Sequence, residues 1–497
     1  MAENNKLKPW QGWALFGGAM VAVFGLGLLC SSLMHRDGEV ASIFNNRKVK
    51  MDKEIESRND LFESDFPLEY ETWLATADSS FNSEFCGQKK VDVLEERPDM
   101  VILWAGYAFS WDYTTPRGHM HAIDDMRETL RTFAPMTEAD KQQPGTCWTC
   151  KSPDVPRLMA EVGEENFYSA PWSKWGDQVM NPIGCSDCHD PATMDLHISR
   201  PALKNAYAAM GKDITKATHQ EMRSLVCAQC HVEYYFAGDK KVATFPWEKG
   251  MTLEAAEAYY DSIGFTDYTH ALSKAPILKA QHPGYEMSLQ GIHGQRGVSC
   301  ADCHMPYKSE GGVKFSDHKV MSPLANIDRT CQVCHREDAE TLRANVYERQ
   351  RKCTEIRNKT EHELAVAHIE AKFAWDKGAT DAEMQEALQY LRKGQWRWDY
   401  AVASHGASFH APQEVTRLLA DGLDYAHKAR FAIARVLAKH GYTDAVPMPD
   451  ITTKEKAQKY IGLDMAQKNA DKKKFLDTVV PAWVKTAVAK GRLKAES

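Results

Sequence analysis

The sequence predicts a mainly α-helical protein, in which short helices and long loops come first and long helices follow. Residues 67–336 are rich in Pro, Gly, Trp, Tyr and His, and no long stretch there keeps the period of a strand or a helix. That pattern is typical of short helices joined by ordered loops. Residues 337–497 instead carry long helical patterns, and strand signals are weak throughout.

The composition is that of an ordinary globular protein of 497 residues. Hydrophobic residues make up 43% and charged residues 26%, which excludes a disordered or fibrous chain. The 61 basic and 68 acidic residues give a net charge of −7 and form no dominant basic block. The chain therefore lacks the basic surface that is typical of nucleic-acid binding, and we expect no nucleic-acid partner.

The first 35 residues predict a membrane anchor. Lys6 and Lys8 precede a stretch without charge that runs from Trp10 to Met34, and about 20 apolar residues span a bilayer as a helix. We expect an export signal that is retained as an anchor, with a cleaved signal peptide as the alternative. Under either interpretation the bulk of the chain lies outside the cytoplasm.

The remaining chain divides into three segments. Residues 36–66 are charged and polar and predict a linker, whereas residues 67–336 hold all five of the chain's C-x-x-C cysteine pairs. Residues 337–497 predict a helical region. One long helix is expected over Glu337–Lys377, and further helical patterns, with Gly at several ends, cover Asp381–Ala403, Pro412–Lys439 and Thr453–Lys490.

Ten of the 13 cysteines form the five pairs, and four pairs are followed directly by histidine. C-x-x-C-H is the attachment signal for c-type haem, because two thiols three residues apart reach the two vinyl groups of one porphyrin and the next side chain lies under the iron. The sequence therefore predicts five covalently bound haems. The pairs are Cys147/Cys150, Cys185/Cys188, Cys227/Cys230, Cys300/Cys303 and Cys331/Cys334, and the histidines are His189, His231, His304 and His335.

Two other uses of paired cysteines fit less well. A zinc ribbon has two C-x-x-C pairs about 15–20 residues apart, whereas successive pairs here are separated by 27 to 69 residues and their number is odd. A thioredoxin-like site has one pair beside a βαβ pattern. Five haems also explain the poor periodicity of residues 67–336, because the porphyrins supply much of the apolar core.

The first pair is followed by Lys151, where the other four have histidine. A lysine amine binds iron only when it is neutral, and burial lowers the pKa of a lysine from its usual value of about 10.4. One distinctive ligand among four ordinary ones predicts a division of labour. Four irons with both axial positions filled would carry electrons, and the fifth would keep an open position for a substrate.

These motifs resemble those of the pentahaem cytochrome c nitrite reductase family, whose members form ammonium. The most specific likeness is the Cys-Trp-Thr-Cys-Lys motif followed by four C-x-x-C-H motifs, and the match extends from about residue 103 to about residue 412. The helical character continues it loosely to the C-terminus. Further stretches that carry it are residues 116–119, 129–132, 227–235, 279–283 and 404–412.

The resemblance assigns residues to a catalytic site. It implies that Lys151 is the proximal ligand of the catalytic haem and that Arg131, Tyr234 and His282 line the opposite face. Arg131 would bind the nitrite anion, and Tyr234 and His282 would donate hydrogen bonds or protons as the N–O bonds break. Without the resemblance, Arg131 is interpreted as a solvated residue of an amphipathic stretch.

The same resemblance implies a calcium ion beside the catalytic haem. Glu233 would bind through its carboxylate and Gln281 through its amide oxygen, whereas Tyr234 and Lys279 would use their backbone carbonyls. Such all-oxygen ligation suits Ca²⁺. The sequence alone gives no signal of this site, because the two pairs of residues lie 46 positions apart and match no calcium-binding loop.

Fifteen of the 19 histidines lie outside the haem motifs, so the sequence does not choose the second axial ligands. The resemblance selects four of them, namely His119, His293, His318 and His410. His121 competes with His119, and His405 competes with His410. Which distal histidine faces which haem stays open.

The sequence thus predicts a periplasmic enzyme that reduces nitrite to ammonium, a conversion that takes up six electrons and eight protons. A multihaem electron-transfer conduit is one alternative, and an enzyme acting on hydroxylamine or sulfite is another. The resemblance implies a membrane-bound multihaem quinol dehydrogenase or a soluble haem protein as electron donor, and the expected anchor favours the former. It also implies a homodimer formed through Glu337–Lys377 and Pro412–Lys439. Three cysteines remain unassigned, namely Cys30, Cys86 and Cys353.

Overall fold

The structure is a computed structural model that describes residues 8–44, 55–85 and 87–494, so that Cys86 lies outside the described residues. The chain divides into two compact units. One comprises Met1–Lys50 with Leu61–Pro67, and the other comprises Met51–Asp60 with Leu68–Ser497.

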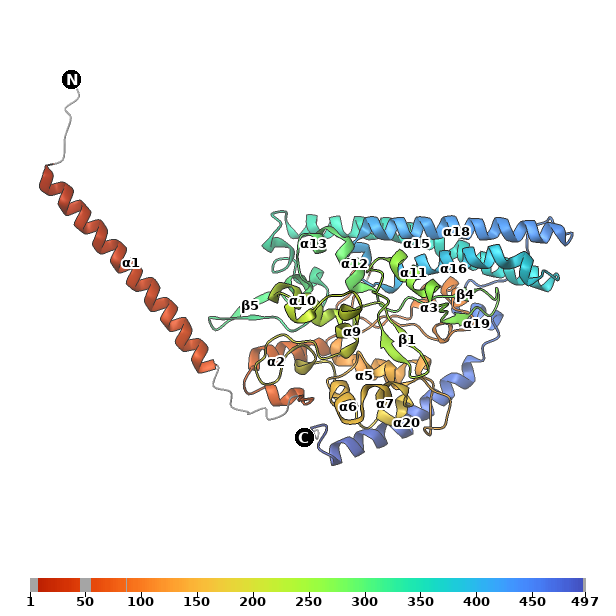
Figure 1. Ribbon diagram of the computed structural model, residues 1–497, viewed down its shortest axis with the longest axis horizontal. Helices are drawn as coiled ribbons and strands as arrows, with labels where there is room; N and C mark the ends of the chain where they lie inside the picture. Colours follow the sequence, from red (N-terminus) through yellow and green to blue (C-terminus); the bar gives the residue numbers. More distant parts are fainter. Residues whose placement is uncertain (1–7, 45–54, 86, 495–497) are drawn as a thin grey trace, which may run out of the picture. The chain divides into compact units, whose positions relative to one another are not determined.

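The first unit contains one long helix, α1 (Pro9–Phe44) (Figure 1). Its stretch Pro9–Ser32 is long and apolar enough to cross a membrane, a test that an N-terminal signal sequence also passes. No other helix among the described residues passes it. The helix continues beyond Met34, so the beginning of the segment predicted as a linker is helical.

The second unit is mainly helical, which confirms the predicted fold class. Its described strands form only three two-stranded antiparallel ladders. These pair β1 (Tyr235–Ala237) with β2 (Val242–Thr244), β3 (Tyr268–Thr269) with β4 (Pro276–Ile277), and β5 (Tyr307–Glu310) with β6 (Val313–Ser316).

Short helices and 3₁₀ turns make up residues 67–336, as predicted. Local caps delimit several of them, for example Thr218 with Glu221 at α10 and Ser299 with Asp302 at α14. The α-helices are α2 (Pro67–Leu74), α3 (Val93–Glu96), α4 (Asp99–Leu103), α5 (Ala122–Glu128), α6 (Asp154–Val162), α7 (Glu164–Ser169), α8 (Cys185–Cys188), α9 (Pro201–Ala209), α10 (His219–Ala228), α11 (Leu253–Ser262), α12 (Gly284–Gln290), α13 (Ile292–Gln295) and α14 (Cys300–His304).

Three long helices lie side by side in the C-terminal region (Figure 1): α15 (Ala339–Asp376), α16 (Asp381–Ala403) and α18 (Pro412–Lys439). The short helix α17 (Ala407–His410) joins the last two. Close packing of α16 and α18 requires small residues at their crossing, because a Cβ on Gly394 or on Gly422 would lie 3.2 Å from the carbonyl oxygen of the other.

The helical pattern over Thr453–Lys490 is not one continuous helix. The structure has two helices there, α19 (Lys454–Tyr460) and α20 (Met465–Ala489). Gly462 adopts a φ of +77° after the first, and the Asp464 side chain accepts the Gln467 N–H at the start of the second. A glycine followed by an N-cap residue ends one helix and starts another.

The core joins the cysteine-rich region to the C-terminal helices. One hydrophobic cluster brings Ile102 and Trp104 from the first together with Trp398 and Leu418 from the second. Another surrounds Trp148 and Trp172 and includes Phe475 of α20, which lies alongside α5. The two predicted regions therefore share one folded unit.

Candidate active site

Each cysteine pair lies on a helical turn or at the end of one. The first lies on a 3₁₀ turn at Gly145–Trp148, the second forms α8, the third ends α10, the fourth opens α14 and the fifth lies on a 3₁₀ turn at Cys331–Val333. Residues three apart on a helical turn project from the same side. Both thiols of each pair are thus presented together, and none of these cysteines forms a disulfide.

The fifth pair lies nearer the surface than the other four. Cys334 is exposed, whereas the nine other cysteines of the five pairs are partly buried. The turn that carries it lies at the surface just before α15, since Val333 is 72% exposed and the side chain of His335 is 48% exposed. A haem attached there would itself cover the turn, and the role of Cys334 in attachment stays a prediction.

Three motif histidines face a second histidine at a nearly constant spacing. Ring centres are 6.3 Å apart for His189 and His318, 6.1 Å for His304 and His410, and 6.2 Å for His335 and His293. An imidazole nitrogen binds a first-row metal ion at about 2.0–2.1 Å, so two imidazoles on opposite sides of one ion have their centres about 6.3 Å apart. The spacing therefore fits an iron between the rings of each pair.

The hydrogen bonds of three of these histidines leave one ring nitrogen available. Nδ1 lies 2.8 Å from the Met194 carbonyl oxygen in His189 and 2.9 Å from that of Met321 in His304. Nδ1 of His318 lies 2.8 Å from the Ser316 carbonyl oxygen. A carbonyl only accepts, so Nδ1 carries the proton and Nε2 keeps a lone pair for a metal.

The third motif is arranged differently. Nδ1 of His231 lies 2.7 Å from Nε2 of His282, and burial together with nearby His282 and His119 lowers the pKa of His231 well below its usual value. His119 is thus near His231, and its competitor His121 is engaged with the Ala77 carbonyl oxygen at 2.9 Å.

His405, the competitor of His410, lies elsewhere. Its ring centre is 5.4 Å from that of His282, whereas His410 faces His304. The structure therefore brings His405 to the pocket predicted at the first motif. Sequence reasoning considered it only as a haem ligand.

The residues predicted for the catalytic pocket gather around the first motif. Burial raises the pKa of Cys147 to about 12, against the effect of the neighbouring charges of Lys151 and Arg131. Tyr234 also lies close, because burial and the thiols of Cys150 and Cys147 raise its pKa well above the usual value. The surroundings of the first motif are therefore poorly hydrated. They contain Arg131, which is always charged, and Lys151, which is charged when protonated.

His282 is held as a neutral imidazole in this pocket. Its Nδ1 donates to the Ala403 carbonyl oxygen at 3.2 Å, so its Nε2 accepts from His231. Burial, with His405 second, lowers the pKa of His282 to about 3, and Lys151 contributes to the same effect. A neutral imidazole both accepts and donates hydrogen bonds.

Arg131 is anchored at one edge of its guanidinium. Nε donates to Thr129 Oγ1 at 3.1 Å, and Cζ lies 4.3 Å from the ring centre of Phe109 and 5.8 Å from that of Tyr113. Among the described residues, no hydrogen bond engages the two terminal nitrogens. The two terminal nitrogens of Arg131 are therefore free to bind one anion through two hydrogen bonds.

The predicted calcium ligands lie together beside this pocket. Glu233 is 1% exposed and accepts the Gln281 backbone N–H at 2.7 Å and the Tyr260 hydroxyl at 3.0 Å. Nε2 of the Gln281 side chain donates to the Lys279 carbonyl oxygen at 3.3 Å. A carboxylate accepts up to four hydrogen bonds or metal contacts, so this oxygen-rich cluster fits a calcium ion.

Three further carboxylates lie around the cluster, and the sequence did not predict them. Glu286 and Asp399 are buried, and Asp267 is partly buried. Burial raises the pKa of Asp267 and of Glu286 to about 7 and raises that of Asp399. Within the described part of the chain, only Asp399 of the three is paired with a cation, Lys279 Nζ at 2.9 Å. These residues come from separate elements, and no local pattern marks them.

Arg200 ties the first three motifs together. Its side chain is 1% exposed and donates to the carbonyl oxygens of Thr149 at 3.0 Å and Ser152 at 2.7 Å. It also pairs at 2.5 Å with Asp187, which lies inside the second C-x-x-C motif. Gln229 of the third motif accepts the Arg200 backbone N–H at 2.8 Å. The three motifs therefore share one hydrogen-bond network.

Comparison with known proteins agrees with this architecture. The sequence pattern of the cytochrome c552 family matches residues 58–491. The chain is 68% identical to a cytochrome c-552 of Bacteroides thetaiotaomicron and 65% identical to one of Porphyromonas gingivalis, in both cases over 99% of each chain. Identity to a cytochrome c-552 of Desulfotalea psychrophila is 46%, over 96% of this chain and 94% of the relative.

A solved structure shares the fold. The cytochrome c nitrite reductase of Desulfovibrio desulfuricans, whose catalytic subunit has two calcium sites, superimposes with a TM-score of 0.74 at 30% identity, covering 84% of this chain and 91% of that one. Together with the family match and the motifs, this shows that the chain belongs to the cytochrome c552 family, that of the ammonia-forming cytochrome c nitrite reductases, which are oxidoreductases.

Proposed function

We propose that this protein reduces nitrite to ammonium at a haem ligated by Lys151 and fed by four bis-histidine haems. The observation that carries the proposal is a contrast between motifs. Three motif histidines face a second histidine across a gap that fits an iron, whereas Lys151 shares its surroundings with Arg131 and His282. The site at Lys151 thus keeps a side for a small anion.

Each side chain around Lys151 would have a separate role in the reaction. A haem bound there would supply the electrons and the position at which nitrite nitrogen binds. Arg131 binds the nitrite oxygens through its free terminal nitrogens and keeps the anion in a dry site.

Tyr234 would donate hydrogen bonds to oxygens that leave as water. His282 would donate there only after exchanging its Nδ1 bond to Ala403 or its Nε2 bond to His231. The ring centre of His405 lies 5.4 Å from that of His282, which makes it a further candidate for proton supply.

The other four haems would carry electrons toward Lys151. The spacing supports the pairs His189/His318, His304/His410 and His335/His293, and His119 remains for His231. Calcium would be held by the Glu233 carboxylate, the Gln281 amide oxygen and the carbonyls of Tyr234 and Lys279. The buried Glu233 carboxylate supports this set, because it accepts the Gln281 backbone N–H at 2.7 Å and so lies beside that residue. Because Nε2 of Gln281 faces the Lys279 carbonyl oxygen, the side-chain amide would turn over when the ion binds.

The protein would work in the periplasm as a homodimer. α1 would serve as signal or anchor, and a membrane-bound multihaem quinol dehydrogenase would deliver electrons. The long helices α15 and α18 would form the dimer interface, which the exposed Phe431 of α18 supports, since 70% of that residue is solvent-accessible.

The decisive experiment measures ammonium formed from nitrite by the purified, haem-loaded protein with a chemical one-electron donor. Near-stoichiometric ammonium is expected. Haem oxidation by nitrite without ammonium would point to another substrate, with hydroxylamine tried next. No nitrite-dependent oxidation would leave an electron conduit as the function.

Replacing the distinctive ligand tests the site itself. In Lys151→His, we expect the Lys-ligated haem to change its absorption and EPR spectra while the four other haems keep theirs, and nitrite turnover to fall by at least about tenfold. His335→Lys at the fifth motif is the matched variant and should leave the spectrum of the catalytic haem unchanged.

A further inference from the structure

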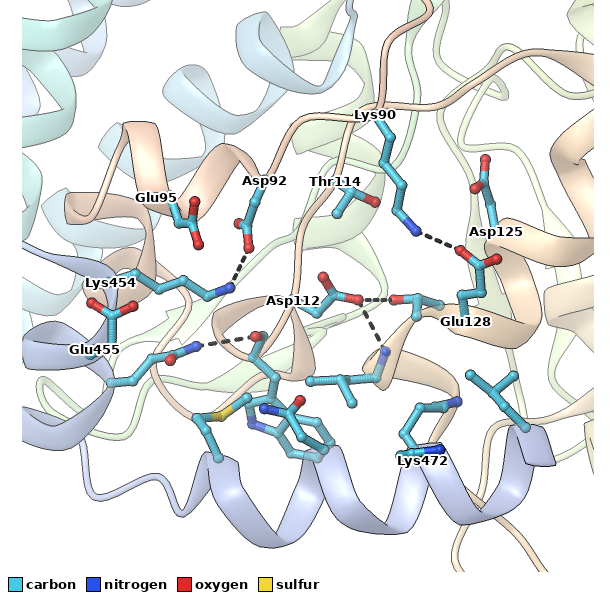
Figure 2. Close-up of a pocket in the computed structure, with 18 of the residues that line it drawn as sticks. Lys90, Asp92, Glu95, Asp112, Thr114, Asp125, Glu128, Lys454, Glu455 and Lys472 are labelled. Atoms are coloured by element: carbon cyan, nitrogen blue, oxygen red, sulfur yellow. Dashed lines mark hydrogen bonds and ion pairs between the residues drawn. The ribbon is translucent and has the colours of Figure 1, made fainter. Parts of the chain in front are cut away.

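The turn that carries Arg131 is held from two sides, by Asp112 and by Lys472 of α20. Both residues line a cavity of about 580 Å³ that Thr129 and Leu130 also border (Figure 2). Neither residue belongs to the haem motifs, the predicted pocket or the calcium cluster. Within the described part of the chain, the hydrogen bonds of both side chains are directed at the turn and its flanks.

Asp112 acts on Arg131 through Thr129. Oδ2 of Asp112 accepts the Thr129 hydroxyl at 2.8 Å and the Leu130 N–H at 3.0 Å. Because the hydroxyl hydrogen is committed to the carboxylate, the lone pairs of Thr129 Oγ1 are left for the Nε–H of Arg131, which donates at 3.1 Å. Hydrogen bonds in such a chain polarise one another and strengthen.

Lys472 holds the backbone on both sides of the same turn. Its Nζ donates to the Arg127 carbonyl oxygen at 3.1 Å and to Thr132 Oγ1 at 3.1 Å. Thr132 in turn lies within hydrogen-bond distance of the Thr129 carbonyl oxygen, at 3.0 Å. The residue is only 4% exposed, and lysine is rarely buried so completely, because the loss of hydration is unfavourable.

The geometry points to a positioning role. We propose that Asp112, Thr129 and Lys472 fix the direction of the Arg131 guanidinium, so that α20 supports anion binding from outside the pocket. A fork held at Nε and stacked on Phe109 loses little further freedom when its terminal nitrogens bind an anion. This inference rests on the proposed function, since it takes Arg131 as the nitrite-binding side chain.

The test uses Thr129→Val, which keeps the shape but removes the hydroxyl, and Thr129→Ser, which keeps the hydroxyl. In the haem-loaded full chain, we expect Thr129→Val to raise the KM for nitrite, and the nitrite Kd from absorbance titration of the oxidised protein, by about tenfold. The kcat should change far less. Thr129→Ser should stay within about twofold of the parent.

Comparing the KM of an anionic substrate with that of an uncharged one separates a misdirected Arg131 guanidinium from a general distortion of the pocket. Hydroxylamine is uncharged at neutral pH, so its KM should move much less than that of nitrite in Thr129→Val. Lys472→Met should act in the same direction as Thr129→Val. Lys473→Met, one position along on the exposed face of α20 and paired with Asp477, should leave both KM values unchanged.

Two results would overturn the inference. One is an unchanged nitrite KM in Thr129→Val with all haem signals intact, and the other is an equal rise for hydroxylamine and nitrite. Arg131→Gln serves as the reference: if it weakens nitrite binding while Thr129→Val does not, only the positioning role fails. If Arg131→Gln leaves nitrite binding intact, the assignment of Arg131 in the proposed function fails first.

Discussion

Gly291, between α12 and α13, lies against the backbone that carries His410. A Cβ at this position would lie 1.7 Å from the His410 carbonyl oxygen, far inside any non-bonded contact distance, so Gly291→Ala must displace that backbone. We expect the variant to lose one low-spin haem signal in EPR of the holoprotein. Gly284→Ala is the control, since its nearest contact would be an ordinary 3.6 Å. An unaltered low-spin spectrum in Gly291→Ala would contradict ligation by His410.

At the residue scale, the sequence reveals what is local. The thiols and the following histidine or lysine are adjacent in the chain, so their roles are predicted from spacing alone. The partner of His189 is not, because His318 is brought opposite it only by the tertiary fold. The same holds for Thr129 and Asp112, whose side chains are ordinary turn residues until the fold places them behind Arg131.

At the element scale, helix limits follow from their end signals. The predicted limits Asp381–Ala403 and Pro412–Lys439 coincide with α16 and α18, because Thr380 with Glu383 forms a capping box and Pro412 occupies a first-turn position. The break before α20 was readable in the same way. Gly462 is a typical helix-ending residue and Asp464 is a typical N-cap residue. The helical pattern on both sides made the break between the two helices hard to recognise.

Burial of Lys472 on α20 has a consequence for stability. Burial lowers the pKa of Lys472 to about 7, with Asp112 opposing the effect. Between that value and the usual one, the unfolded chain binds more protons than the folded chain, so the free energy of unfolding rises with pH. We expect the parent protein to gain about 2 kcal/mol relative to Lys472→Met between pH 7 and about pH 9, measured by urea unfolding.

Lys473→Met provides the comparison for this titration. Its side chain is 77% exposed, so its loss should shift the free energy of unfolding by a similar small amount at both pH values. A Lys472→Met difference that does not vary with pH would show that this amine keeps an ordinary pKa in the folded protein.

At the scale of the whole molecule, the exposed face of α18 carries a testable consequence. Phe431 is 70% exposed, which is unusual for a large apolar side chain on a long, otherwise well-packed helix. If α15 and α18 form the dimer interface, Phe431→Glu should shift the protein toward monomers, with at least about a tenfold weaker dimer, measured by sedimentation velocity. Ile263→Glu, at a site that is 49% exposed on another element, should leave the dimer intact.

The sequence predicted the character of the two main regions but not how they join. Pro and Gly content separated residues 67–336 from the helices that follow, and the fold keeps that division in secondary structure. The shared core does not respect it, because Trp104 contacts Trp398 at a ring-centre distance of 5.6 Å. Contacts between segments that are far apart in the sequence do not appear in the hydrophobic periodicity of either segment.

The network of Arg200 joins the first cysteine motif to a residue that is synthesised later. A chain emerges N-terminus first, so Cys147 and Cys150 appear well before Arg200 and the third motif at Gln229. Until then the carbonyls of Thr149 and Ser152 lack the donor that they have in the folded protein. If haem is attached to the first motif before residue 200 has emerged, the carbonyls of Thr149 and Ser152 would be hydrated during attachment, and their loop would close once Arg200 is in place.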